Sequence, residues 1–110
     1  MHSHDLLNFV LEQLANMKAQ NSVSLDVQRI SSITDYMVVT TGTSSRHVIA
    51  IAQKLEQSAR QGGLLVLGIE GAQQGTWVLL DLGDVIIHVM QAESREFYAL
   101  EKLWQHEYSF

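Results

Sequence analysis

The sequence contains no cysteine and no proline, and only 17% of its residues are charged. Without cysteine, the chain can form neither a disulfide framework nor a thiolate metal site. It also lacks an apolar run approaching the roughly 18 residues that a membrane span requires. The N-terminal residues MHSHDLL contain no cationic leader followed by a long apolar segment, so we predict no signal peptide. These absences exclude disulfide-stapled and membrane-spanning classes, and we expect a soluble cytoplasmic protein.

Basic residues are also scarce. Seven Lys and Arg, scattered along the chain, stand against 12 Asp and Glu, which gives a net charge of −5 at pH 7. Proteins that bind nucleic acid usually carry a basic surface that displaces counterions from phosphates. We therefore expect little direct RNA binding, and docking on a basic protein component of any nucleoprotein particle that this chain meets.

The 110 residues, 46% of them hydrophobic, are enough for one core and too few for two, so we predict a single domain over residues 1–110. Apolar spacing predicts a helix over 5–19, capped by Ser3 or Asp5, and a second that begins at Ser44 or Ser45 and ends at Gly62-Gly63. The buried stripe of the first helix is Leu6, Leu7, Val10, Leu11, Leu14 and Met17. That of the second is Val48, Ile51, Ala52, Leu55 and Ala59.

Five segments have the composition of strands. They are 23–27 near a sheet edge, 35–41 in a more central place, 64–69 as a buried strand, and the pair 76–81 and 84–90 as a hairpin. Residues 71–75 form a polar loop. A last helix begins near Ser94, with Phe97, Leu100, Leu103 and Trp104 on its apolar side, and 105–110 is a loose tail. The order α β β α β β β α predicts an α/β fold, with a mixed sheet of about five strands and flanking helices.

The hairpin is apolar on both faces, which requires an explanation. A two-residue turn at Leu82-Gly83 pairs Asp81 with Asp84 and Trp77 with His88. Alternation then separates the side chains into two sets. One set is aliphatic: Val78, Leu80, Val85, Ile87 and Val89. The other is mixed: Trp77, Leu79, Asp81, Asp84, Ile86 and His88.

Two interpretations of the mixed face stay open at this point. An apolar and aromatic centre with an acidic rim is typical of a protein interface. The last helix could equally cover this face, which would make Trp77 a core residue. Leu82 is also a poor residue for positive φ, and a three-residue loop with a bulge at Gly83 would shift one strand by one residue and blur the division.

Catalytic patterns are incomplete. The segment Gly42–Arg46 between strand and helix could bind an anion, or could simply cap the helix. Nucleotidyltransferases place a Gly-Ser pair at such a junction and two metal-binding carboxylates on the next strand, but here LLVLGIE follows, and Asp81 and Asp84 come only later.

The histidines likewise show no pattern for holding a metal. None of the five has the spacing of helical metal ligands. His2 and His4 could bind a metal adventitiously, and His88 is better explained as a strand residue hydrogen-bonded beside Trp77. We predict no catalytic residue, no metal and no cofactor.

Four segments together carry a family resemblance: SSITDYMVVTTGTSSRHVIAIA, GLLVLGIEG, WVLLDLGDVIIHVM and ESREFYALEKLW. In this order, from about Leu25 to Trp104, they resemble the ribosomal silencing factor family (RsfS, iojap-related). The resemblance implies a nucleotidyltransferase-like fold without the catalytic carboxylates. It implies a translational repressor that binds the large ribosomal subunit through a basic ribosomal protein on the intersubunit face and sterically blocks the small subunit, chiefly when nutrients are short.

The resemblance also implies residues and alternatives. Trp77, the strand ends around Asp81, Leu82 and Asp84, and Glu70 match the family's partner-binding region, to which the mixed face adds Leu79 and His88. Members of the family are similar in forming homodimers, so self-association is expected. A large-subunit assembly factor using the same surface is one alternative. A metal-dependent nucleotidyltransferase using Gly42, Ser44, Asp81 and Asp84 is the other.

Overall fold

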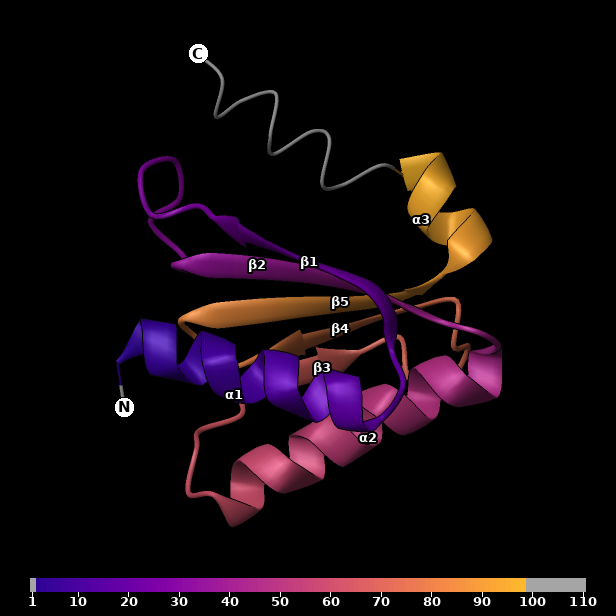
Figure 1. The fold of residues 1–110 in the computed structure, drawn as a ribbon, viewed down its shortest axis with the longest axis horizontal. Helices are drawn as coiled ribbons and strands as arrows, with labels where there is room; N and C mark the ends of the chain where they lie inside the picture. Colours follow the sequence, from indigo (N-terminus) through magenta and orange to yellow (C-terminus); the bar gives the residue numbers. More distant parts are fainter. Residues whose placement is uncertain (1, 99–110) are drawn as a thin grey trace.

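The computed structural model describes the backbone of residues 2–98 and the side chains of residues 2–95. Its elements follow the predicted order and form one five-stranded mixed sheet with flanking helices (Figure 1). They are α1 (Ser3–Asn16), β1 (Gln20–Asp26), β2 (Tyr36–Gly42), α2 (Ser45–Gln61), β3 (Gly68–Glu70), β4 (Trp77–Asp81), β5 (Val85–Gln91) and α3 (Ala92–Tyr98).

The sheet has the strand order β1-β2-β5-β4-β3. The pair β2 and β5 is parallel, and the other neighbouring pairs are antiparallel. β1 therefore lies at an edge and β2 inside the sheet, as predicted. Because of these directions, the amino ends of β2, β3 and β5 lie at the same end of the sheet as the carboxyl ends of β1 and β4.

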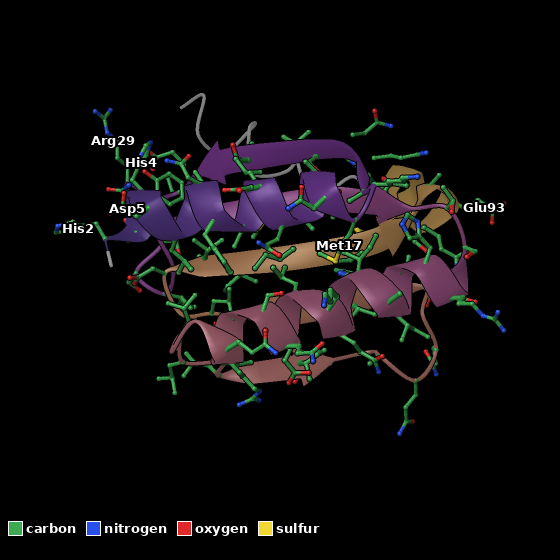
Figure 2. The ribbon with its side chains drawn as sticks, turned by 60° about the horizontal axis from the view of Figure 1, so that its bottom comes forward. His2, His4, Asp5, Met17, Arg29 and Glu93 are labelled. Atoms are coloured by element: carbon green, nitrogen blue, oxygen red, sulfur yellow. The ribbon has the colours of Figure 1, made fainter. Side chains whose placement is uncertain are left out.

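Both long helices lie on one face of the sheet and run beside each other (Figures 1 and 2). Their apolar stripes pack on the aliphatic set of the hairpin, which is fully buried there. The core contains Leu6, Leu7, Val10 and Leu14 of α1, all five predicted residues of α2, Val38 of β2, Val78 and Leu80 of β4, and Val85, Ile87 and Val89 of β5. The hairpin thus gives its aliphatic face to the core.

Local chemistry explains the limits of α2. The Ser44 hydroxyl accepts a hydrogen bond from the backbone N–H of His47 (3.1 Å), which satisfies one of the free amides of the first turn. At the other end, Gly63 has φ +78°, and the N–H of Leu64 returns to the carbonyl oxygen of Ala59 (2.9 Å). Both observations confirm the predicted boundaries of this helix.

The last helix begins at Ala92, within two residues of the predicted start near Ser94. Two other local predictions were wrong. The residue before α1 is His2, and neither Ser3 nor Asp5 caps the helix with its side chain. Segment 64–69 is not a buried strand, because only Gly68–Glu70 pairs, and it does so at the sheet edge with β4 as its sole neighbour in the strand order. Leu65 and Leu67 are 73% and 58% exposed as a result.

Two further predictions fall outside the described residues: the apolar side of the last helix (Phe97, Leu100, Leu103 and Trp104) and the tail 105–110. Within residues 2–98, no helix combines the length and the apolar character needed to cross a membrane.

Candidate partner-binding surface

The hairpin register differs from the predicted one by two residues. Asp81 pairs with Ile86 and Trp77 with Met90. The turn is centred on Gly83-Asp84, with Gly83 at φ +85°, and the N–H of Leu82 donates to the carbonyl oxygen of Val85 (3.0 Å). Gly83, and not Leu82, therefore adopts the left-handed conformation. Since a shift of two residues preserves alternation, the predicted division into two faces is confirmed.

The face directed away from α1 and α2 is built from rows of side chains that cross the strands. One row runs Asp81–Ile86–Met37–Leu25 and the next Leu79–His88–Val39–Val23, with Gly68 and Glu70 of β3 beside Asp81 and Leu79. A third row starts with Trp77 and Met90 and continues to Thr41. The structure therefore brings Trp77, Leu79, Asp81, Glu70 and His88 together on one face.

Burial across this face is uneven. Met37, Val39 and Met90, with Val27, form a small second cluster and are nearly inaccessible, while α3 contacts β5 and β2. Towards β4 and β3, the side chains remain partly or fully exposed. We name this accessible part the hairpin surface; it consists of Glu70, Trp77, Leu79, Asp81 and Ile86. The β2 side of the face is therefore covered, whereas the hairpin surface is not fully buried, and its use as a protein interface stays a prediction.

A hydrogen bond fixes the aromatic ring at one end of the hairpin surface. The indole Nε1–H of Trp77 donates to Nδ1 of His88 over 2.9 Å, and the ring centroids are 5.8 Å apart with an angle of 48° between the planes. Because Nδ1 accepts this bond, the proton of the neutral imidazole resides on Nε2. The pairing confirms the prediction that His88 is hydrogen-bonded beside Trp77.

His88 is itself only 6% exposed. Burial penalises the imidazolium and lowers the pKa of His88 from 6.5 to about 4. The ring is therefore neutral at pH 7 and stays an acceptor for Trp77. Because His88 is buried, it orients Trp77 through this hydrogen bond and exposes little surface of its own.

The acidic residues of the predicted site lie at separate places. Asp81 lies in the first row, where one carboxylate oxygen accepts the backbone N–H of Gly83 (2.8 Å) and so supports the turn. Asp84 is exposed in the turn itself. Glu70 is exposed on β3, opposite Leu79. Leu82, by contrast, is 6% exposed and belongs to the helix-side core, so its side chain is not part of the hairpin surface.

The four residues of the nucleotidyltransferase alternative do not meet. Gly42 ends β2 and Ser44 follows it, whereas the Asp84 carbonyl oxygen accepts the N–H of Tyr36 at the amino end of the strand (3.0 Å). The length of β2 thus separates the two halves of that site. Among the described residues, no group of three or more His, Asp or Glu is placed to hold a metal ion.

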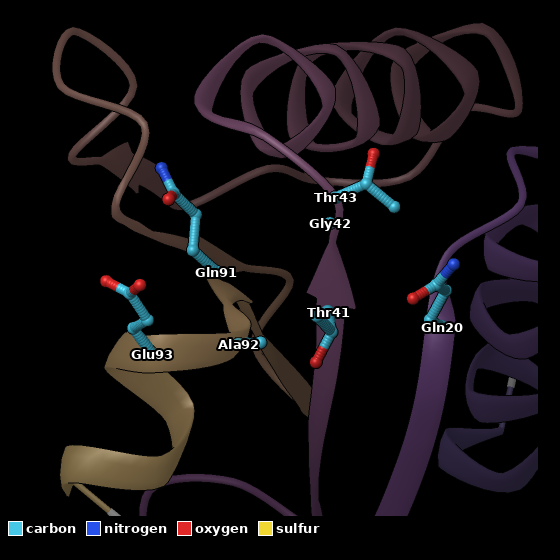
Figure 3. A pocket seen from close by; sticks show the side chains of 7 residues that line it. All are labelled: Gln20, Thr41, Gly42, Thr43, Gln91, Ala92 and Glu93. Carbon is cyan, nitrogen blue, oxygen red and sulfur yellow. The ribbon is translucent and has the colours of Figure 1, made fainter.

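A polar pocket of about 340 Å³ lies at the carboxyl ends of the parallel strands β2 and β5 (Figure 3). Gly42 lines it, and its lack of a Cβ allows close packing against α2, because a Cβ there would lie 2.7 Å from Cγ2 of Val48. The backbone N–H of Thr43 donates to Nδ1 of His47 (2.9 Å), a further bond at the start of α2. The lining is Gln20, Thr41, Gly42, Thr43, Gln91, Ala92 and Glu93. Its hydroxyl and amide groups, with one carboxylate, do not form the phosphate-binding loop that would mark a nucleotide site.

Comparison with known proteins identifies the family of the chain. Residues 1–109 match the family model described as ribosomal silencing factor during starvation. The ribosomal silencing factor RsfS of Haemophilus influenzae is 44% identical over 99 residues, which cover 90% of this chain and 97% of that protein. The mouse protein named mitochondrial assembly of ribosomal large subunit protein 1 is 32% identical over 101 residues, covering 89% of this chain and 44% of its own length.

The fold is shared with a crystal structure of a protein from Chromobacterium violaceum. The two structures superpose with a TM-score of 0.93 at 34% sequence identity, over 96% of this chain and 88% of that one. The more specific relation to nucleotidyltransferases stays a prediction. The family model spans nearly the whole sequence, and the chain belongs to the ribosomal silencing factor family.

Proposed function

We propose that this protein represses translation by binding the large ribosomal subunit, through a basic ribosomal protein on the intersubunit face. The observation that carries the proposal is family membership, since the matching family is named for ribosomal silencing. The hairpin surface supplies a structural basis: a half-buried Trp77 held by His88, Leu79 and Ile86 in the next two rows, and Glu70 and Asp81 at the rim.

The composition of this surface favours a basic protein over RNA as the direct contact. Glu70 and Asp81 would repel phosphates and attract Lys or Arg side chains. Trp77 and Leu79 supply apolar area whose removal from water favours binding. The same reasoning assigns little affinity to bare ribosomal RNA.

The proposed mechanism is steric and includes no chemical step. A docked domain fills space on the intersubunit face that the small subunit needs, so the two subunits cannot join. This role requires no catalytic residue, metal or cofactor, and its site of action is the cytoplasm. We place its use chiefly in nutrient limitation, and self-association to a homodimer is part of the proposal.

Sucrose-gradient sedimentation of purified mature subunits tests the proposed function. Adding the protein before the subunits are mixed should move material from joined ribosomes to free subunits. Trp77→Ala is the matched control. With this variant, the ratio of joined to free subunits should be the same as without added protein. If the wild-type protein does not change the ratio of joined to free subunits, direct anti-association is contradicted.

A second candidate function is assembly of the large subunit, which the name of the mouse relative favours. The contacts would be the same and the time of action earlier. Quantitative co-purification decides between the two functions. An assembly factor should be enriched on incomplete large subunits, and a repressor on mature ones.

A further inference from the structure

Exposed apolar side chains gather at one end of the sheet. In the part of the chain that the structure describes, the exposed large hydrophobic residues are Ile30, Ile33, Leu65 and Leu67, with 38%, 78%, 73% and 58% of their surfaces accessible. The first two lie between β1 and β2, and the other two between α2 and β3. Both connections meet the sheet at the end that also carries the β4–β5 turn (Figure 1).

The two apolar pairs are joined by the turn. The N–H of Asp35 donates to the carbonyl oxygen of Asp84 (3.0 Å), which ties the segment after Ile33 to the hairpin. On the other side, a Cβ at Gly83 would lie 3.7 Å from Cδ1 of Leu67. The turn residues Gly83 and Asp84 therefore lie between the segment that follows Ile33 and the side chain of Leu67.

This end of the molecule is acidic between its apolar parts. Asp84 is exposed and Asp35 partly so, and Asp26 and Asp81 terminate the neighbouring strands. The basic side chains nearest this end, within residues 2–95, are Arg29 and Arg60. Arg29 lies in the β1–β2 connection beside Ile30, and Arg60 is paired with Glu56 (3.1 Å).

We propose that this end is a second docking surface, which binds an extended protein segment with basic residues at its centre and apolar residues at its ends. We name it the sheet-end surface: Ile30, Ile33, Asp35, Leu65, Leu67 and Asp84. Exposed apolar area beside polar residues is typical of interaction sites. The negative charge of this surface favours a basic partner. The aspartates would repel RNA, and they would also repel a second copy of this chain, whose net charge is −5.

The strand order sets the length of the segment. Strands lie about 4.8 Å apart, so three to four intervals separate the two apolar pairs by roughly 15–19 Å. An extended chain advances about 3.3 Å per residue. The two apolar anchors of the partner should therefore be about five or six residues apart.

NMR titration of the uniformly ¹⁵N-labelled chain with synthetic peptides tests this inference. The probe is a peptide of about eight residues with leucines six positions apart and lysine and glycine between them. We expect amide shifts concentrated in residues 30–35, 65–67 and 83–84. A peptide with glutamate in place of lysine should not bind. A peptide with adjacent leucines should bind about tenfold more weakly, because it buries one apolar anchor fewer.

Protein variants complete the test. The double variant Ile33→Ser, Leu67→Ser should bind the probe about tenfold more weakly or worse. Retained dispersion of its amide spectrum shows that this variant is folded. Trp77→Ala should leave probe binding unchanged, which separates this inference from the proposed ribosomal function. Shifts centred on the hairpin surface, or equal binding of the glutamate peptide, would overturn the proposal. It would also be overturned if raising the protein concentration alone shifted the amides at this end. No binding at millimolar peptide would contradict it as well.

Discussion

Trp77 and His88 are joined by a hydrogen bond of 2.9 Å between Nε1 and Nδ1, although they are eleven positions apart in the chain. The observed register places Leu79 opposite His88, so the bond is diagonal across the hairpin. A buried neutral imidazole thereby fixes the orientation of a partly buried indole. Protonation of His88 would remove the acceptor of Trp77, so the orientation of the indole depends on the neutral imidazole.

The folded state should lose stability in mild acid because of His88. Its pKa falls from 6.5 to about 4 on folding, so between these values the unfolded chain binds a proton that the folded chain does not. The contribution is fully present above pH 6.5 and is lost as pH falls towards 4. A shift of this size corresponds to about 3 kcal/mol in total, of which about 2 kcal/mol is lost by pH 5.

Urea unfolding at pH 7, 6 and 5 measures this effect. His88→Gln retains an acceptor for Trp77 and cannot titrate in this range, so its free energy of unfolding should change much less between pH 7 and 5. Equal pH dependence in the wild-type and variant proteins would show that His88 is not the responsible group.

Truncation of a leucine should lower the free energy of unfolding strongly in the core and only slightly in the connection between α2 and β3. Leu80 is fully buried beneath α2, and Leu80→Ala should lower the free energy of unfolding by about 2–5 kcal/mol. Leu65 is 73% exposed, and Leu65→Ala should change it by less than about 0.5 kcal/mol. Chemical denaturation gives both values. A loss above 1 kcal/mol for Leu65→Ala would support the buried strand that the structure excludes.

The turn glycine should be intolerant of a side chain for conformational reasons. Gly83 has φ +85°, where an L-residue is strained, so Gly83→Ala should destabilise the fold by about 1 kcal/mol. Gly68→Ala is the control, because no atom lies within 4 Å of the added Cβ and φ is not positive there. If the two substitutions have equal effects on the melting temperature, the turn is not centred on Gly83-Asp84.

The cap of α2 should depend on one of two adjacent serines. Ser44→Ala removes the acceptor of the His47 N–H and should cost about 1 kcal/mol of stability, whereas Ser45→Ala should cost much less. Thermal or urea unfolding of the two single variants decides between the two positions that the sequence left open. Greater destabilisation by Ser45→Ala would assign the cap to Ser45.

The sequence predicts the elements of this fold well because their periods are local properties. The stripe from Val48 to Ala59 and the alternation of the hairpin depend only on spacing along the chain. For the same reason the division of the hairpin into two faces is right although its register is wrong by two residues. The register depends on which residue takes positive φ, and Gly83 rather than Leu82 does so.

What depends on long-range pairing could not be predicted. Leu64–Ile69 has the composition of a buried strand, and only the strand order shows that β3 lies at the edge. The burial of Leu82, and the separation of Gly42 from Asp84 by the length of β2, follow from the same pairing. Met37 and Val39 join the face through the parallel pair β2 and β5, which joins segments about 50 residues apart and has no local signal in the sequence.

Co-sedimentation with purified large ribosomal subunits tests the central claim most directly. Trp77→Ala truncates the aromatic side chain of the hairpin surface, and we predict a loss of about 2–4 kcal/mol of binding, that is, at least about thirtyfold weaker association. Gln53→Ala, an exposed change on α2 at the other side of the sheet, should co-sediment as the wild type does. If a folded Trp77→Ala variant co-sediments at wild-type strength, the hairpin surface is not the site that binds the ribosome.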